Sequence, residues 1–121
     1  MSADAGEPTP ILDSERLAEI DQLEAFRPGL RLSLVDKFEA TLRSRLAICH
    51  QPDGDAAALR EAAHALKSVA GSLGADRLLA AATQVEQLAD DPALPAAIAT
   101  LHDEAERASA ALRVWAQGGD R

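Results

Sequence analysis

The stretch EAAHALKSVAGSLGADRLLAAATQVEQL, residues 61–88, contains two apolar stripes of helical period joined by almost no loop. Apolar residues recur there every three or four positions, which is the spacing of one helix face. Gly74 suits the left-handed conformation that often ends a helix, and Asp76 can cap the helix that follows. Because the connection is so short, we expect two antiparallel helices packed side by side. Their inward positions are Leu59, Ala62, Leu66, Val69 and Leu73 on the first helix, and Leu78, Ala82, Val85 and Leu88 on the second.

The same period appears in the chain before this hairpin. A long helix is expected from about Gly29 to His50, and a shorter helix before it can be capped by Asp13 or Ser14. The sequence RPGL, residues 27–30, separates the two. The inward positions are Leu17, Ile20 and Leu23 on the short helix, and Leu34, Phe38, Leu42, Leu46 and Cys49 on the long one.

The remaining turns complete a bundle. The sequence QPDGD, residues 51–55, ends the long helix and offers Asp53 or Asp55 as the next cap. Asp91 with Pro92 can begin the last helix. Four amphipathic helices and one short one predict an all-α protein, namely an antiparallel four-helix bundle with an additional short N-terminal helix. The last helix has its apolar seam at Ile98, Leu101, Ala105, Ala108, Leu112 and Trp115.

The composition is that of one soluble domain with an aliphatic core. The chain has 121 residues, enough for a single domain, and only 2% are aromatic. We expect a linker or disordered tail at 1–12, the bundle at 13–117 and a frayed tail at 118–121. The net charge of −8 excludes an extended nucleic-acid surface, because phosphate backbones require clustered Lys and Arg. With no stretch apolar enough for a bilayer and a single cysteine, we expect a cytoplasmic protein without an internal disulfide.

The first helix of the hairpin carries one histidine, His64, opposite its apolar stripe. At about 100° per residue, the same face holds Arg60, Lys67, Ser68 and Gly71. This face is predicted to be cationic and low in relief. Glycine inside a helix costs about 1 kcal/mol relative to alanine, so Gly71 indicates that a small residue is needed there. Another protein could therefore reach the imidazole.

An exposed histidine of this kind can act as a nucleophile. A solvent-exposed imidazole is mostly neutral at cellular pH, and one of its ring nitrogens then has a free lone pair. Lys67 and Arg60 supply positive charge for an arriving group in an otherwise acidic protein. A phosphoryl group, with its negative oxygens, is the natural candidate.

The run HALKSVAGSLG, residues 64–74, resembles the signature of the histidine-containing phosphotransfer (HPt) domain. That signature is a histidine followed by x-Leu-Lys-Gly and, six residues later, a glycine. His64, Leu66, Lys67 and Gly74 fit it, whereas Ser68 stands at the position of the first glycine. Serine is still small, and its hydroxyl can bond back to the carbonyl of residue 64.

The sequence that follows, ADRLLAAATQVEQLAD at residues 75–90, is similar to the next helix of the HPt family. In the family, an apolar residue followed by a glutamate recurs about two turns into that helix. Here these residues are Val85 and Glu86. The specific motif therefore covers residues 63–88, while the bundle pattern extends from Asp13 to about Gln117.

The resemblance implies a phosphorelay intermediate. His64 would accept a phosphoryl group from the aspartyl phosphate of a response-regulator receiver domain and pass it to another receiver. Lys67 would screen the charge of the phosphohistidine, and Arg60, Ser68 and Gly71 would shape the landing surface. The sequence has no G-x-x-x-x-G-K-[ST] loop and no kinase-type glycine loop, so we expect a carrier without kinase activity.

The resemblance also indicates the surroundings of the chain. No cofactor or metal is expected on it, and the Mg²⁺ belongs to the receiver. The chain is expected to be a monomer, and its linker-like start favours a module of a hybrid sensor kinase that can be tethered to a membrane.

Three alternatives remain open at this point. A docking bundle could bind a protein partner without phosphotransfer, and it would have no need for His64. Glu61 and His64 also show the Glu-x-x-His spacing of di-iron bundles, but the second copy is missing and both residues face away from the predicted core. A third alternative is the dimerising helical hairpin of a histidine kinase.

The other chemically distinctive residues have structural interpretations. His102 and Glu106 lie one helical turn apart, which predicts a surface ion pair. His50 is expected near the negative end of its helix dipole. Cys49 is interpreted as a small buried hydrophobic residue.

Overall fold

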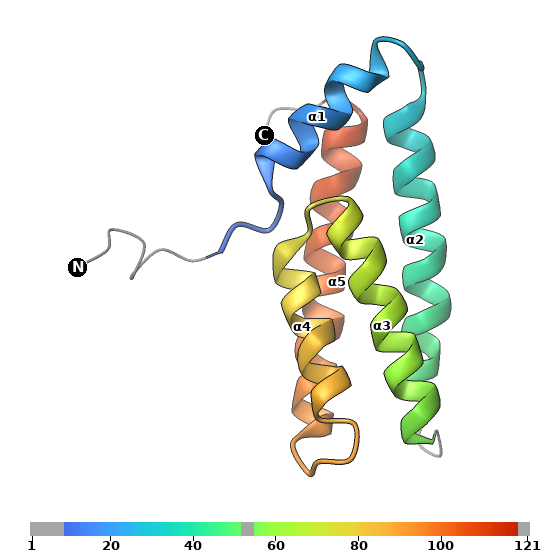
Figure 1. The fold of residues 1–121 in the computed structure, drawn as a ribbon, viewed down its shortest axis with the longest axis vertical. Helices are drawn as coiled ribbons and strands as arrows, with labels where there is room; N and C mark the ends of the chain where they lie inside the picture. Colours follow the sequence, from blue (N-terminus) through green and yellow to red (C-terminus); the bar gives the residue numbers. More distant parts are fainter. Residues whose placement is uncertain (1–8, 52–54, 119–121) are drawn as a thin grey trace, which may run out of the picture.

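The computed structural model describes residues 9–51 and 55–118, and these residues form five α-helices (Figure 1). The prediction of an all-α fold is confirmed. The helices are α1 (Ser14–Glu24), α2 (Leu30–Cys49), α3 (Ala56–Ser72), α4 (Asp76–Gln87) and α5 (Leu94–Ala116).

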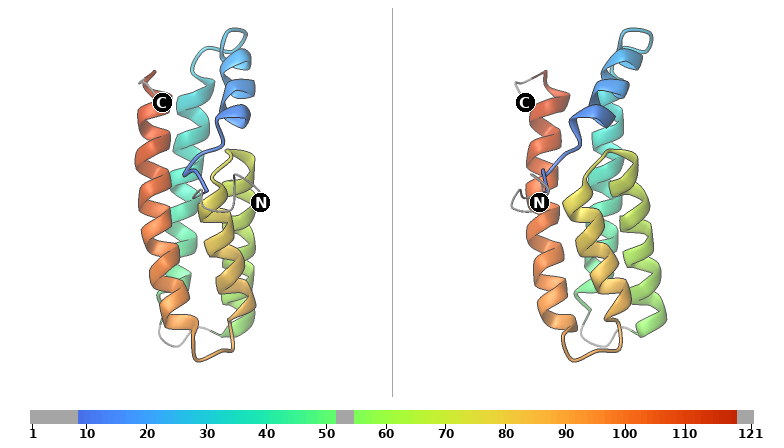
Figure 2. Two further views of the ribbon diagram at one scale, coloured as in Figure 1. Left: turned by 90° about the vertical axis from the view of Figure 1, so that its left-hand side faces the viewer. Right: turned by 60° about the vertical axis from the view of Figure 1, so that its left-hand side comes forward.

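Helices α2 to α5 form an antiparallel bundle in which α2 and α5 run its full length (Figure 1). The shorter hairpin of α3 and α4 packs against their lower part, and α1 lies obliquely above the α3–α4 turn (Figure 2). Two hydrogen bonds hold α1 there, from the Asp13 amide to the Gly74 carbonyl at 2.8 Å and from Arg16 Nε to the Ser72 carbonyl at 2.9 Å. The short N-terminal helix thus covers the end of the hairpin.

The core of the bundle is aliphatic, with a few large residues. Trp115, Phe38, Leu66 and Leu101 are among its fully buried side chains. Val35 is also fully buried, although the predicted stripe placed Leu34 there, and Leu34 is only partly buried. Because α2 packs against both α3 and α5, its buried face is wider than one stripe.

Side-chain caps are present at the starts of α1 and α3 but not of α2, α4 and α5. The carboxylates of Asp13 and Asp55 accept hydrogen bonds from the amides of Glu15 and Ala58 at 3.0 and 2.7 Å. The cap of α4, however, is Ala75, so the prediction that Asp76 caps this helix is wrong. Asp76 is its first residue, where a negative charge still faces the positive end of the helix dipole. The other expected cap, Asp53, lies outside the described residues. The prediction that Asp91 with Pro92 begins the last helix is wrong, because α5 starts at Leu94 and the Asp91 carboxylate accepts a hydrogen bond from the Ala93 amide in the preceding turn.

Gly74 ends α3 as its sequence position predicts. Its φ is +69°, in the left-handed region that glycine adopts at little cost. The Ala75 amide donates to the Ala70 carbonyl at 2.9 Å, and the Gly74 amide donates to the Gly71 carbonyl at 3.3 Å. This pair of bonds is the Schellman motif, and it reverses the chain within three residues.

A second turn, between α1 and α2, depends on Glu24. Its carboxylate accepts hydrogen bonds from the amides of Gly29 and Arg31 at 2.5 and 2.8 Å, which satisfies the N-terminus of α2. The bond from the Arg31 amide is the main reason why the pKa of Glu24 lies below its usual value. Nearby, the indole of Trp115 donates to Asp21 at 3.0 Å and so joins α5 to α1.

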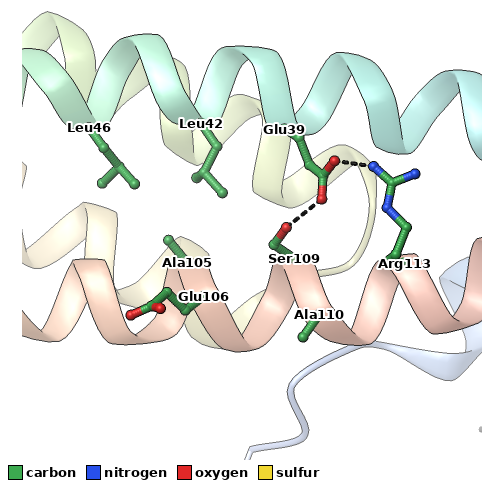
Figure 3. A pocket seen from close by; sticks show the side chains of 8 residues that line it. All are labelled: Glu39, Leu42, Leu46, Ala105, Glu106, Ser109, Ala110 and Arg113. Atoms are coloured by element: carbon green, nitrogen blue, oxygen red, sulfur yellow. Dashed lines mark hydrogen bonds and ion pairs between the residues drawn. The ribbon is translucent and has the colours of Figure 1, made fainter.

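Glu39 forms a polar contact between α2 and α5 (Figure 3). Its carboxylate accepts a hydrogen bond from the Ser109 hydroxyl at 2.6 Å and pairs with the guanidinium of Arg113. The bond from Ser109 is the largest cause of a lowered pKa at Glu39, followed in the same direction by Arg113, while burial opposes them. The cluster lies beside a groove that Leu42 and Leu46 line.

The N-terminal segment includes residues that contact the bundle. Ile11 and Leu12, at the end of the segment assigned to a tail, are partly buried against the core. Residues 1–8 and 119–121 lie outside the described part of the chain, so the domain boundaries stay predictions. Within residues 9–51 and 55–118, no helix has the length and apolar character needed to cross a membrane.

Candidate functional site

His64 lies on the outward face of α3, with 69% of its side chain exposed. Its neighbours Ala62, Ala63 and Leu66 are buried, because they point across the helix into the core. The exposure of His64 therefore agrees with the side of the helix that the helical period predicts for it. A histidine packed inside the core is excluded.

Glu86 on α4 connects His64 with Lys67. Its carboxylate accepts a hydrogen bond from Lys67 Nζ at 2.8 Å, and its second oxygen lies 3.6 Å from His64 Nδ1. The bond from Lys67 is the main reason why the pKa of Glu86 lies below its usual value, and the charges of Lys67 and His64 act in the same direction. Glu86 thus stays ionised at neutral pH.

The position of Glu86 distinguishes the two nitrogens of His64. A carboxylate close to Nδ1 favours a proton on that nitrogen, although 3.6 Å is too long for a good hydrogen bond. The lone pair of the neutral ring is then on Nε2. Nδ1 faces Glu86 on α4, whereas no contact of Nε2 with a described residue is present.

Arg60 forms an ion pair with Asp90, which lies in the turn after α4. Both side chains are well exposed, at 46% and 72%. Together with the Lys67–Glu86 pair, this contact overturns part of the prediction. The face is not freely cationic, because both of its cations are held by carboxylates from the neighbouring helix and the turn that follows it.

The contributions of Glu86 and Asp90 were not predicted, although the sequence contains a signal for them. Every α-helix rises by the same distance per residue. In two antiparallel helices joined by a tight turn, residues equally far from the turn in sequence therefore lie side by side along the bundle axis. His64 and Glu86 each lie eleven residues from Ala75, and Arg60 and Asp90 each lie fifteen. Counting from the turn identifies both carboxylates.

Ser68 and Gly71 continue the exposed face beyond His64. A Cβ at Gly71 would lie 3.4 Å from Leu79 Cδ1, an ordinary contact, so the helix itself has room for alanine. Within the described residues the Ser68 hydroxyl has no hydrogen-bond partner, and the expected bond to the carbonyl of residue 64 is not formed. Both residues next to the imidazole are exposed and carry little or no side chain.

The other distinctive residues have structural roles. His102 Nε2 lies 3.2 Å from a carboxylate oxygen of Glu106 on the surface, so the predicted contact between these two side chains is formed. The ring of His50 contacts that of His102 edge-on, with centroids 5.5 Å apart. Cys49 is buried, which raises the pKa of its thiol. In the described parts of the chain, no three His, Cys, Asp or Glu side chains gather as metal ligands.

The family model described as Hpt domain matches residues 33–111, which include all of α3 and α4 and most of α2 and α5. This chain belongs to the Hpt domain family. Hpt proteins are phosphotransfer carriers of two-component phosphorelays, in which they work with receiver domains, and this chain has such a histidine phosphotransfer role. The resemblance stated from residues 63–88 is thereby confirmed.

Solved structures of Hpt proteins share the fold. Histidine-containing phosphotransfer protein B (HptB) from Pseudomonas aeruginosa PAO1 is 25% identical, with a TM-score of 0.80 over 93% of this chain and 100% of that one. A putative histidine-containing phosphotransfer protein from rice is 18% identical, with a TM-score of 0.69 over 88% and 80% of the two chains. ZmHP2 from maize is 21% identical, with a TM-score of 0.63 over 85% of each. No curated protein sequence matches the chain.

Proposed function

We propose that His64 is the residue of this Hpt domain that accepts the phosphoryl group from a receiver domain and passes it to another. The observation that supports this most strongly is the environment of the ring. His64 is exposed on a low helix face, with Nδ1 turned toward an ionised carboxylate. A docking module would have no use for this arrangement.

The transfer step follows from the two nitrogens. The lone pair of Nε2 attacks the phosphorus of the receiver's aspartyl phosphate, and an N–P bond forms while the P–O bond to the aspartate breaks. The electron pair of the broken bond returns to the receiver's carboxylate. The phosphorylated ring, still protonated on Nδ1, carries a positive charge that Glu86 stabilises from 3.6 Å. Return to a second receiver is the same step reversed.

The neighbouring residues assist without taking part in bond formation. Lys67, held 2.8 Å from Glu86, places a positive charge beside the ring where the phosphoryl oxygens arrive. Ser68 and Gly71 keep the surface low so that the receiver can approach. The Mg²⁺ is proposed to belong to the receiver, whose acidic site would hold it.

The test is transfer of label from phosphorylated receivers to the purified chain. We expect an acid-labile, alkali-stable label on His64 that is absent from the His64→Gln variant. In Lys67→Ala the label should form about tenfold more slowly, because a hydrogen bond to a charged group is lost at a partly exposed site. Label that arrives from ATP alone would contradict the role of a carrier.

The same assay can identify which class of receiver domain donates the phosphoryl group. We propose that the donor is a receiver domain of a hybrid sensor kinase and that the chain acts as a monomer. The assay should therefore compare receivers fused to kinases with free-standing ones. Transfer only from the free-standing receivers would contradict this choice of donor.

A further inference from the structure

The ion pair of Arg60 and Asp90 lies one helical turn from His64. Side chains on an α-helix lean toward its N-terminus, so the ring of His64 leans over the turn that carries Arg60. Lys67, on the other side, is 29% exposed and is bound to Glu86. Arg60, at 46%, is the more exposed of the two cations, and it is paired with Asp90.

The pairing of Arg60 with Asp90 affects the charge balance around the ring of His64. The carboxylates of Glu86 and Asp90 contact the two cations of this face, Lys67 and Arg60, and Glu61 is a further exposed acidic residue of α3. A phosphoryl group adds further negative charge and three acceptor oxygens. Such a group is destabilised here unless one of the cations turns toward it.

We propose that Asp90 is a latch on Arg60, and that Arg60 leaves Asp90 to bind the phosphoryl group on His64. This proposal rests on the function proposed above for His64. An exposed ion pair is weak, and a phosphoryl group binds a guanidinium more strongly than a single carboxylate does. The competition between Asp90 and the phosphoryl group then sets how readily the group moves on to the next receiver.

Substitution at Asp90 is a direct test of the latch. The measured quantity is the equilibrium ratio of phosphohistidine to receiver aspartyl phosphate when the chain is mixed with one receiver. Asp90→Asn should raise this ratio about two- to fivefold, the range that an exposed ion pair allows, and Arg60→Gln should lower it by a similar factor. Both positions are exposed, so the variants should fold, and their unfolding midpoints are measured alongside.

The double variant separates a latch from a general charge effect. If Asp90 acts by holding Arg60, Asp90→Asn has no effect in the Arg60→Gln background. Asp103→Asn, which removes an equal charge from an exposed position of α5, is the matched control and should leave the ratio unchanged.

Two outcomes overturn the latch. One is an Asp90→Asn effect of equal size with and without Arg60, and the other is no effect of Asp90→Asn in the wild-type background. The absence of label on His64 in the unmodified chain is a different result, because it would refute the proposed function itself.

Discussion

Two glutamates in this bundle join pairs of helices, and they differ in what their second partner can do. Glu86 connects α3 and α4 and pairs with Lys67, while Glu39 connects α2 and α5 and pairs with Arg113. Both have a pKa below the usual value because of the hydrogen bonds they accept. At Glu39 the second partner is the hydroxyl of Ser109, whereas at Glu86 it is the exposed imidazole of His64.

The two clusters differ in whether the second partner keeps an atom that can react. The Ser109 hydroxyl gives its single hydrogen to Glu39 within a part-buried contact, so the cluster is complete and holds two helices together. The imidazole of His64 presents one nitrogen to Glu86 and keeps another for solvent. A similar set of charges is thus structural in one place and, in the proposed function, reactive in the other.

The largest expected effect separates the two clusters outright. His64→Gln should abolish label transfer, since no other imidazole of the described residues lies beside Glu86, while the unfolding midpoint stays unchanged. Ser109→Ala should do the reverse, with normal transfer and a lower midpoint. For both variants, label transfer from a phosphorylated receiver and the midpoint of thermal unfolding are measured. Loss of transfer in Ser109→Ala would show that the two clusters do not act separately.

Two glycines show the same contrast between a structural and a proposed functional position: Gly74 in the α3–α4 turn and Gly71 within α3. Gly74→Ala should destabilise the protein by about 2 kcal/mol, because alanine is strained at a φ of +69° and its Cβ would lie 2.9 Å from that of Asp13. Chemical denaturation measures this. Unchanged stability would mean that the α3–α4 turn adapts.

Gly71 should respond in the opposite direction. Gly71→Ala should stabilise the protein by up to about 1 kcal/mol, since the site has room and alanine is the better helix former. Transfer from the receiver should nevertheless slow, because the new methyl group stands on the landing surface. An unchanged transfer rate would remove Gly71 from the proposed receiver contact.

The smallest expected effect concerns pH. A carboxylate with a lowered pKa stabilises the folded state above its usual value of 4.5 and loses this effect as the pH falls through the lowered value. Glu39→Gln should therefore lower the unfolding midpoint by about 2–4 °C at pH 7, with a smaller difference from the wild type below pH 4.5. A difference that does not change with pH would assign the stabilisation to packing alone.

The sequence predicts most of the fold and part of the site for one physical reason. The period of apolar residues decides which side of a helix is buried, so the exposure of His64 and the burial of Leu66 and Trp115 follow from it. Capping residues and Gly74 set the helix ends to within a residue or two. The exceptions are Gly29, Ala75 and Ala93, which cap α2, α4 and α5 without a side-chain hydrogen bond.

Contacts between helices are harder to predict, because they depend on register. The periodicity of α3 places Lys67 and Arg60 on one face but does not say which residues of the neighbouring helix face them. A cationic surface was therefore expected where the structure has two ion pairs. Only the tightness of the turn at Gly74 and Ala75 makes that register countable.

The most direct test of the central claim is to find which nitrogen carries the phosphate. The chain, labelled with ¹⁵N in its histidines and phosphorylated by a receiver, can be examined by ¹⁵N and ³¹P NMR. We predict a single phosphorylated histidine, His64, with phosphorus bonded to Nε2 and a proton retained on Nδ1 beside Glu86. Phosphate on Nδ1, or on His50 or His102, would contradict this.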